Sequence, residues 1–298
     1  MRRIYKIVAV MAVVLGTMLS PLFASSGEPN STSRREMRRE LRKFGEVMKS
    51  LNKNHKDTLN YGDLVDRAIV AALSGCDPHS RYLTAEMMEQ LQGSIEVDKS
   101  VSEASMLNDS VGYIKVEQFG REAAQEISKA IEQLGDINTL ILDLRDNLGG
   151  VMEEAISTAG LFLSDAKSIT RGEYRGVADV QFMTQKDGEH LNIRLFILIN
   201  ENSSSASEIV VSALQDHSRA EVLGVQSFGK GLILRPFYFG DGSVVYMAVG
   251  QYVTPSGRVI QNSYKEGLFL KGGVIPNIQI DSVSFYKKSQ ILEYILKL

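Results

Sequence analysis

Apolar residues recur every three to four positions in the first third of the chain. This spacing predicts an amphipathic helix over residues 34–51, a second helix over 61–73 and a third over 85–91. Thr84 stands directly before the third helix, where a threonine side chain can cap the first turn. The pattern therefore predicts a helical N-terminal segment over residues 27–92.

Beyond residue 110 the pattern changes to short apolar runs separated by amphipathic segments. The runs predict strands over 111–119, 139–144 and 193–199, and the segments between them predict helices over 121–134 and 152–163. This alternation of strand and helix favours an α/β core in which the strands pair in parallel.

Two further stretches complete the predicted organisation. Residues 236–262 are rich in β-forming side chains around an Asp241–Gly242 turn, which predicts additional strands in the C-terminal part. Residues 93–109 are polar and show no clear period, so we predict that they form a linker between the helical segment and the core.

The N-terminus has the pattern of a targeting segment. Three basic residues lie within the first six positions, an apolar run follows over 7–19, and small residues stand at 24–26. This order predicts a signal peptide over residues 1–26 and a protein exported to the bacterial periplasm or cell envelope. A retained membrane anchor is the alternative, although the apolar run is short for a membrane span.

Composition limits the classes of function. The chain has 298 residues, of which 44% are hydrophobic and 23% charged, and this balance is typical of a globular protein. The net charge of −3 gives no indication of a nucleic-acid surface. The single cysteine, Cys76, excludes an internal disulfide, and the four histidines do not form the HExxH pattern of a zinc protease.

The stretch 197–234 concentrates the candidate chemistry. Ser203, Ser204, Ser205 and Ser207 crowd one predicted strand-to-helix turn, where a serine acts either as a helix cap or as a nucleophile. Lys230 follows a second apolar run. It can act as a base if burial lowers its pKa, or it can be an ordinary solvated lysine.

A glycine turn follows the predicted strand over 139–144. It reads Arg-Asp-Asn-Leu-Gly-Gly over 145–150, and glycines let a backbone present its N–H groups to an anion. The turn is therefore either part of an oxyanion hole or a plain connection between a strand and a helix.

Seven short sequence motifs together resemble those of a known family. They are DPHS at 77–80, GYI at 112–114, LILDLRDNLGG at 140–150, SSSASEI at 203–209, ALQDHSRA at 213–220, SFGKG at 227–231 and TPSGRVIQ at 254–261. In this order they resemble the C-terminal processing peptidases, or tail-specific proteases, of serine peptidase family S41. The resemblance implies a crotonase/ClpP-like α/β peptidase core over 110–298, with additional C-terminal strands and a terminal helix.

The resemblance also implies roles for individual residues. The nucleophile would be Ser205, and the base would be Lys230, which follows it by 25 positions. The backbone N–H of Ala206 and that of Gly149 or Gly150 would form the oxyanion hole. The implied chemistry uses no metal and no cofactor, and the implied partners are polypeptides cleaved in the C-terminal regions of exported proteins.

The chain departs from the family pattern at two places. A PDZ domain usually stands between the helical segment and the core, and the 17 residues of 93–109 are too few to fold one. Four residues after the lysine the family usually has a glutamine that orients the lysine, and this chain has Leu234. If residues 230–234 form a strand, Leu234 shares one face with Lys230.

Two hypotheses of different classes follow. The first is an exported serine endopeptidase with a Ser205/Lys230 dyad. The second is a catalytically weak or inactive S41-like protein that binds peptides or acts as a scaffold in the cell envelope. The predicted N-terminal helices either pair two copies as a homodimer or pack on the core of their own chain.

Overall fold

The computed structural model describes residues 31–93, 99–265, 268–280 and 287–298. The predicted signal peptide lies outside these ranges. Within the described ranges, no helix combines the length and the apolar character that crossing a membrane requires.

The larger of two main sheets has six strands in the order β13-β8-β7-β4-β3-β2, and every pair is parallel except the antiparallel edge pair β2–β3. The strands are β2 (Val101–Met106), β3 (Val111–Val116), β4 (Thr139–Asp143), β7 (Arg194–Ile199), β8 (Ala220–Gly224) and β13 (Ile278–Gln279). Central strands such as β4 are buried along their whole length, because both faces of the sheet are covered. The predicted parallel α/β core is confirmed.

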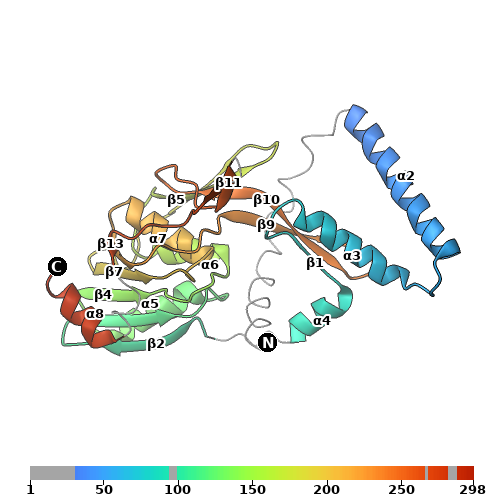
Figure 1. The fold of residues 1–298 in the computed structure, drawn as a ribbon. Helices are drawn as coiled ribbons and strands as arrows, with labels where there is room; N and C mark the ends of the chain where they lie inside the picture. The colour runs from blue at the N-terminus through green and yellow to red at the C-terminus, as the bar shows by residue number, and fades with distance from the viewer. Residues whose placement is uncertain (1–30, 94–98, 266–267, 281–286) are drawn as a thin grey trace.

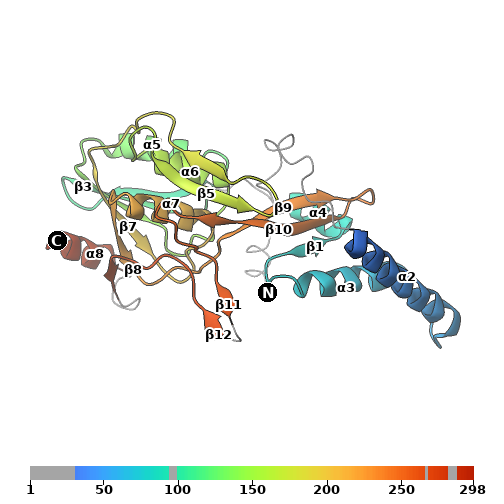
Figure 2. The ribbon, with the colours of Figure 1, turned by 90° about the horizontal axis from the view of Figure 1, so that it is seen from above.

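Helices cover both faces of this sheet (Figures 1 and 2). The main hydrophobic core lies between one face and the helices α5 (Ala123–Leu134), α6 (Met152–Gly160) and α7 (Ala206–Asp216). The terminal helix α8 (Lys288–Ile295) packs on the opposite face through Ile291 and Ile295.

The second sheet joins the N-terminal segment to the core. Its strands run in the order β1-β10-β5-β6, with β9 paired to β10. They are β1 (Arg81–Leu83), β5 (Ser168–Tyr174), β6 (Val180–Met183), β9 (Leu232–Tyr238) and β10 (Val244–Val253), and a separate hairpin pairs β11 (Ser263–Lys265) with β12 (Leu268–Leu270). One end of β10 pairs with β1 and the other end with β5, so the segment before the core contributes a strand to it.

The three predicted N-terminal helices are present as α2 (Ser31–Asn54), α3 (Tyr61–Ser74) and α4 (Ala85–Gly93). The backbone N–H of Met87 donates to Thr84 Oγ1, which confirms the predicted cap. Helix α2 projects away from the core (Figures 1 and 2). Its apolar stripe is exposed, as shown by Met37, Leu41, Phe44 and Val47. The alternative that the N-terminal helices pack on their own core is therefore wrong for α2, whereas α3 and α4 contact β1 of the second sheet.

Three sequence-based expectations need correction. Residues 101–106 of the predicted linker form the edge strand β2, whose half-buried side carries polar as well as apolar residues and so gives little periodic signal. Strand β9 begins at Leu232, so residues 230–234 are not all in a strand. Strands β5 and β6 were not anticipated, since the polar residues within them hide the strand period.

Candidate active site

The serine-rich turn connects β7 to α7, and three of its four serines are structural. Ser203, Ser204 and Ser207 are almost completely buried. Each hydroxyl donates to a backbone carbonyl in or directly before the glycine turn, namely Leu144 O, Leu148 O and Asn147 O. Ser205 alone of the four is not buried and lines a pocket. The structure therefore separates one candidate nucleophile from three serines that dock the two turns together.

Ser205 adopts a backbone conformation that is unusual for a residue with a side chain. Its φ is 56° and its ψ is −114°, immediately before the first residue of α7. Such a conformation costs about 1–3 kcal/mol, and it persists only where the surroundings enforce it. A Cβ built on Gly149 would lie 2.8 Å from Ser205 Cβ, so only glycine fits beside the serine in this arrangement.

Glu208 connects the serine turn to the lysine loop. Its carboxylate is 1% exposed and accepts four hydrogen bonds. Oε2 accepts from the backbone N–H groups of Ser205 and Lys230, each at 2.9 Å, and Oε1 accepts from the Ser227 hydroxyl and the Gly229 N–H. Burial raises the pKa of Glu208, and the four donors counteract this rise. One buried side chain therefore fixes the backbone of both predicted dyad residues.

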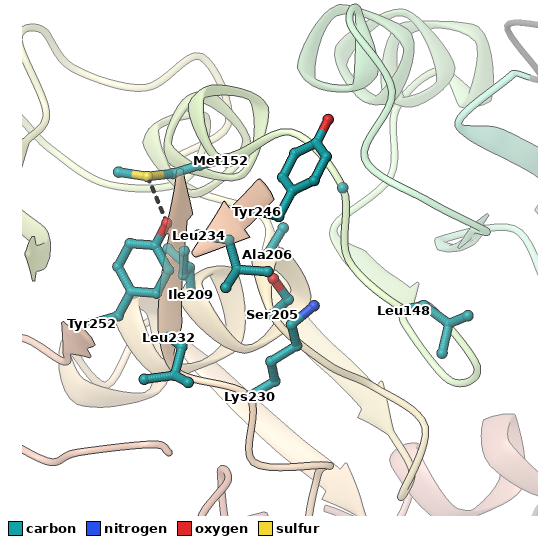
Figure 3. A pocket seen from close by; sticks show the side chains of 11 residues that line it. Leu148, Met152, Ser205, Ala206, Ile209, Lys230, Leu232, Leu234, Tyr246 and Tyr252 are labelled. Atoms are coloured by element: carbon teal, nitrogen blue, oxygen red, sulfur yellow. Dashed lines mark hydrogen bonds between the residues drawn. The ribbon is translucent and has the colours of Figure 1, made fainter. Parts of the chain in front are cut away.

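Lys230 is 5% exposed and projects into the same pocket as Ser205 (Figure 3). The pKa of Lys230 is lowered to about 8, mainly by burial and also by the charge of Arg81, while Glu208 acts in the opposite direction. A lysine with this pKa is partly a free amine near neutral pH, and a free amine can accept a proton. The two predicted dyad side chains are thus brought together in a setting suited to base catalysis.

The two candidate oxyanion glycines differ in their surroundings. The Gly149 N–H already donates to Asn147 Oδ1 at 2.9 Å. Gly150 lines the pocket together with Ser205 and Ala206, the first residue of α7. A Cβ on Gly150 would lie 2.2 Å from Phe119 O, so this position also requires glycine. The geometry favours Gly150 over Gly149 as the partner of the Ala206 N–H.

Leu234 is 7% exposed and lines the pocket with Lys230. The two side chains meet there although the strand begins only at Leu232, because the loop before β9 carries Lys230 to the same space. An apolar side chain contributes to the burial of the amine, but it offers no hydrogen bond. The remaining wall of the pocket is mostly apolar, with Leu148, Met152, Ile209, Leu232 and Tyr252.

Sequence reasoning missed two groups in this site. Glu208 stands three residues after Ser205, and a glutamate at this spacing after a serine is the pattern of a capping box, which could have indicated it. Arg81 lies about 150 residues before Lys230 in the chain, yet its charge acts on the amine. No local pattern indicates this approach, because it depends on the pairing of β1 with β10.

The α/β core thus carries a strained serine at a helix start and a buried lysine in the same pocket, an arrangement that agrees with the fold class predicted from the sequence. The sequence model of peptidase family S41 matches residues 110–280, which is more than half of the chain. The chain belongs to peptidase family S41.

Curated relatives match the chain over a limited part of their length. The carboxyl-terminal-processing protease of Synechocystis is 38% identical over 160 residues, covering 51% of this chain and 37% of the relative. Carboxyl-terminal-processing peptidase 1 of Arabidopsis thaliana, a chloroplast protein, is 36% identical over 149 residues, covering 49% and 30%. The chain therefore spans about a third of the length of these relatives.

Solved structures share the fold at low sequence identity. The photosystem II D1 C-terminal processing protease has a TM-score of 0.53 at 23% identity, over 72% of this chain and 51% of that chain. A lipoprotein from Streptococcus agalactiae has a TM-score of 0.57 at 17% identity, over 93% of this chain and 99% of that chain. The second likeness extends to nearly the whole of both chains.

Proposed function

We propose that this chain is an exported serine endopeptidase of the C-terminal processing type that uses Ser205 as nucleophile and Lys230 as base. The observation that carries the proposal is the pocket shared by these two side chains. It contains the one unburied serine of the turn and a buried lysine whose pKa is lowered to about 8. The named relatives are processing peptidases, in agreement with this activity.

The reaction would proceed in two stages. Lys230 Nζ accepts the proton of the Ser205 hydroxyl, and Oγ attacks the scissile carbonyl carbon. The N–H groups of Ala206 and Gly150 stabilise the negative oxygen of the tetrahedral intermediate. The Lys230 ammonium then gives its proton to the departing amine. In the second stage the neutral Lys230 amine takes a proton from water, and the resulting hydroxide attacks the carbonyl carbon of the acyl-enzyme. The Lys230 ammonium then returns the proton to Ser205 Oγ as the ester bond breaks.

The substrate class follows from the wall of the pocket and from the relatives. Leu232, Leu234 and Ile209 favour an apolar side chain next to the scissile bond. We infer that the substrates are C-terminal regions of exported proteins, reached after export through the signal peptide predicted over residues 1–26. We also infer a homodimer formed through the exposed apolar stripe of α2, a state that light scattering at micromolar concentration measures.

A serine-directed fluorophosphonate tests the activity without knowledge of the substrate. The wild-type protein is expected to react at Ser205 at a rate that rises with pH, half-maximal near pH 8, because protonation of Lys230 below its pKa removes the base. Ser205→Ala is expected to show no labelling, and Ser204→Ala, which alters a buried neighbour, retains it. Absence of labelling in the wild type between pH 6 and about 10 would contradict the proposal.

The alternative of an inactive scaffold is not favoured. A protein that only binds peptides gains nothing from a strained serine, and burying an amine costs free energy. This protein has both features, since Ser205 adopts the strained backbone conformation and the amine of Lys230 is buried.

Leu234→Gln is expected to raise the rate of cleavage by about tenfold. A glutamine amide at this position offers the oxygen that a leucine lacks, and poor positioning of a catalytic group alone can cost about 100-fold. The measurement compares kcat of Leu234→Gln with that of Leu234→Met, which keeps the apolar character. Equal kcat values for the wild type and Leu234→Gln would show that Lys230 is already held in place by other groups.

A further inference from the structure

Arg81 reaches the candidate site from the N-terminal segment. It lies on β1, where it is the register partner of Tyr246 on β10. Its guanidinium carbon lies 5.8 Å from the centroid of the Tyr246 ring, and Tyr246 lines the pocket that holds Ser205 and Lys230. Pairing of the two strands therefore places a permanent positive charge behind one wall of the pocket.

This guanidinium lacks the partner that such a group normally has. Its Nε and Nη2 atoms are inaccessible to solvent and have no hydrogen-bond acceptor among the described residues. In the same protein, Arg145 binds a carboxylate through the edge of its guanidinium formed by Nε and Nη2. Its Nε lies 2.9 Å from Asp143 Oδ1, and its Nη2 lies 2.5 Å from Asp143 Oδ2.

Arg81 as a whole is half-buried, but these two nitrogens have lost their hydration without gaining an acceptor, and this costs free energy. The contact with the Tyr246 ring offsets only part of that loss. Burial lowers the pKa of Arg81, yet an arginine remains charged at any pH relevant to the protein. A contribution to stability therefore does not explain why an arginine stands at position 81. The charged and titratable groups around Lys230 offer another explanation.

The groups that face Lys230 differ in charge. Glu208 is the acid, and it favours the ammonium form of the lysine. Tyr246 and Tyr252 line the pocket and are neutral near pH 8, since burial raises the pKa of both. Burial lowers the pKa of His79, which favours its neutral form as well. Arg81 is thus the cation among these groups that keeps its charge near pH 8.

We propose that Arg81 is a positioning residue that keeps Lys230 in its free-amine form by charge repulsion. The inference rests on the proposed Ser205/Lys230 dyad and adds a third residue to it. A neighbouring cation disfavours the ammonium form of a buried lysine. Arg81 therefore supports the base at a site where Leu234 supplies no hydrogen bond, and it does so at a cost in stability.

Competitive acetylation with acetic anhydride tests the inference on the full chain. Mass spectrometry follows the reaction of Lys230 as a function of pH, with the exposed Lys167 as an internal reference. In Arg81→Met the midpoint for Lys230 is expected to rise by roughly one pH unit, because the repelling charge is gone. Arg81→Lys, which retains a cation, is expected to shift it less, and His79→Gln is expected to leave it unchanged.

Two further measurements separate this role from a structural one. Arg81→Met is expected to unfold at the same temperature as the wild type or higher, because an apolar side chain replaces an unpaired charge. Fluorophosphonate labelling of Ser205 in Arg81→Met is expected to fall about five- to tenfold at pH 7.5 and to approach the wild-type rate at high pH.

The outcomes are distinct. An unchanged acetylation midpoint in Arg81→Met overturns the inference, and so does a clear loss of thermal stability, which would make Arg81 a structural residue. Absence of fluorophosphonate labelling in the wild type overturns the proposed peptidase activity instead. The acetylation midpoint would still decide whether Arg81 governs the protonation of Lys230.

Discussion

An unstructured polypeptide with an apolar C-terminus is expected to remain intact in the presence of Ser205→Ala or Lys230→Ala. The wild-type protein is expected to cleave it. Loss of the nucleophile leaves no group that forms the acyl-enzyme, and loss of the base leaves the Ser205 hydroxyl protonated. Each substitution is expected to lower kcat by at least about 1,000-fold, and the double variant is expected to be no slower than either single variant.

The control for the lysine is Lys167→Ala. Lys167 is exposed and follows Ser164 at the spacing of another serine–lysine motif, Ser-x-x-Lys. Its removal is expected to leave kcat unchanged, because that pair lies outside the pocket. Cleavage by purified Ser205→Ala at the wild-type rate would exclude the proposed mechanism.

Glu208→Gln is expected to impair both stability and activity. The four groups that contact the carboxylate all donate hydrogen bonds, and a glutamine NH2 group cannot accept those on its side. Each buried donor left without an acceptor costs about 1–3 kcal/mol, so a loss of about 3 kcal/mol in the free energy of unfolding is expected. The backbones of Ser205 and Lys230 also lose their common anchor, which is expected to lower kcat about 100-fold.

Urea unfolding and steady-state cleavage measure these two effects separately. Glu221→Gln is the matched control, since it makes the same chemical change at an exposed position of β8. It is expected to change neither quantity. A Glu208→Gln variant with wild-type stability and kcat would show that the carboxylate is not the connection between the serine turn and the lysine loop.

The elements of the core with strong periodicity were predictable. The apolar run over 139–144 corresponds to β4, and the amphipathic segment over 121–134 corresponds to α5. Strands β2, β5 and β6 were missed or assigned to a linker, because they carry polar side chains on partly exposed faces. Periodicity is visible only where buried positions carry apolar side chains; β2 and β6 are at most half-buried, and β5 buries Thr170 and Gly172 beside Ile169.

The candidate site also has a part that sequence motifs predict and a part that they do not. The sequence motifs around Ser205 and Lys230 indicate a nucleophile and a base, since spacing and residue type suffice to match the pattern of family S41. Local sequence does not distinguish Ser205 from the three neighbouring serines by geometry. Their hydrogen bonds to the glycine turn distinguish them, and that turn lies more than 50 residues earlier in the chain.

Residue types and their order along the chain suffice to predict the α/β class, the resemblance to family S41 and the candidate pair Ser205 and Lys230. These properties depend on residue type and on short-range order along the chain. The folded structure is needed to show that Gly150 lines the pocket, that Glu208 joins the two halves of the site, and that Arg81 lies over the Tyr246 ring at the pocket wall. Those relations depend on strand pairing and burial between distant segments, and the free energy of a buried charge or hydrogen bond depends on the groups that surround it in space.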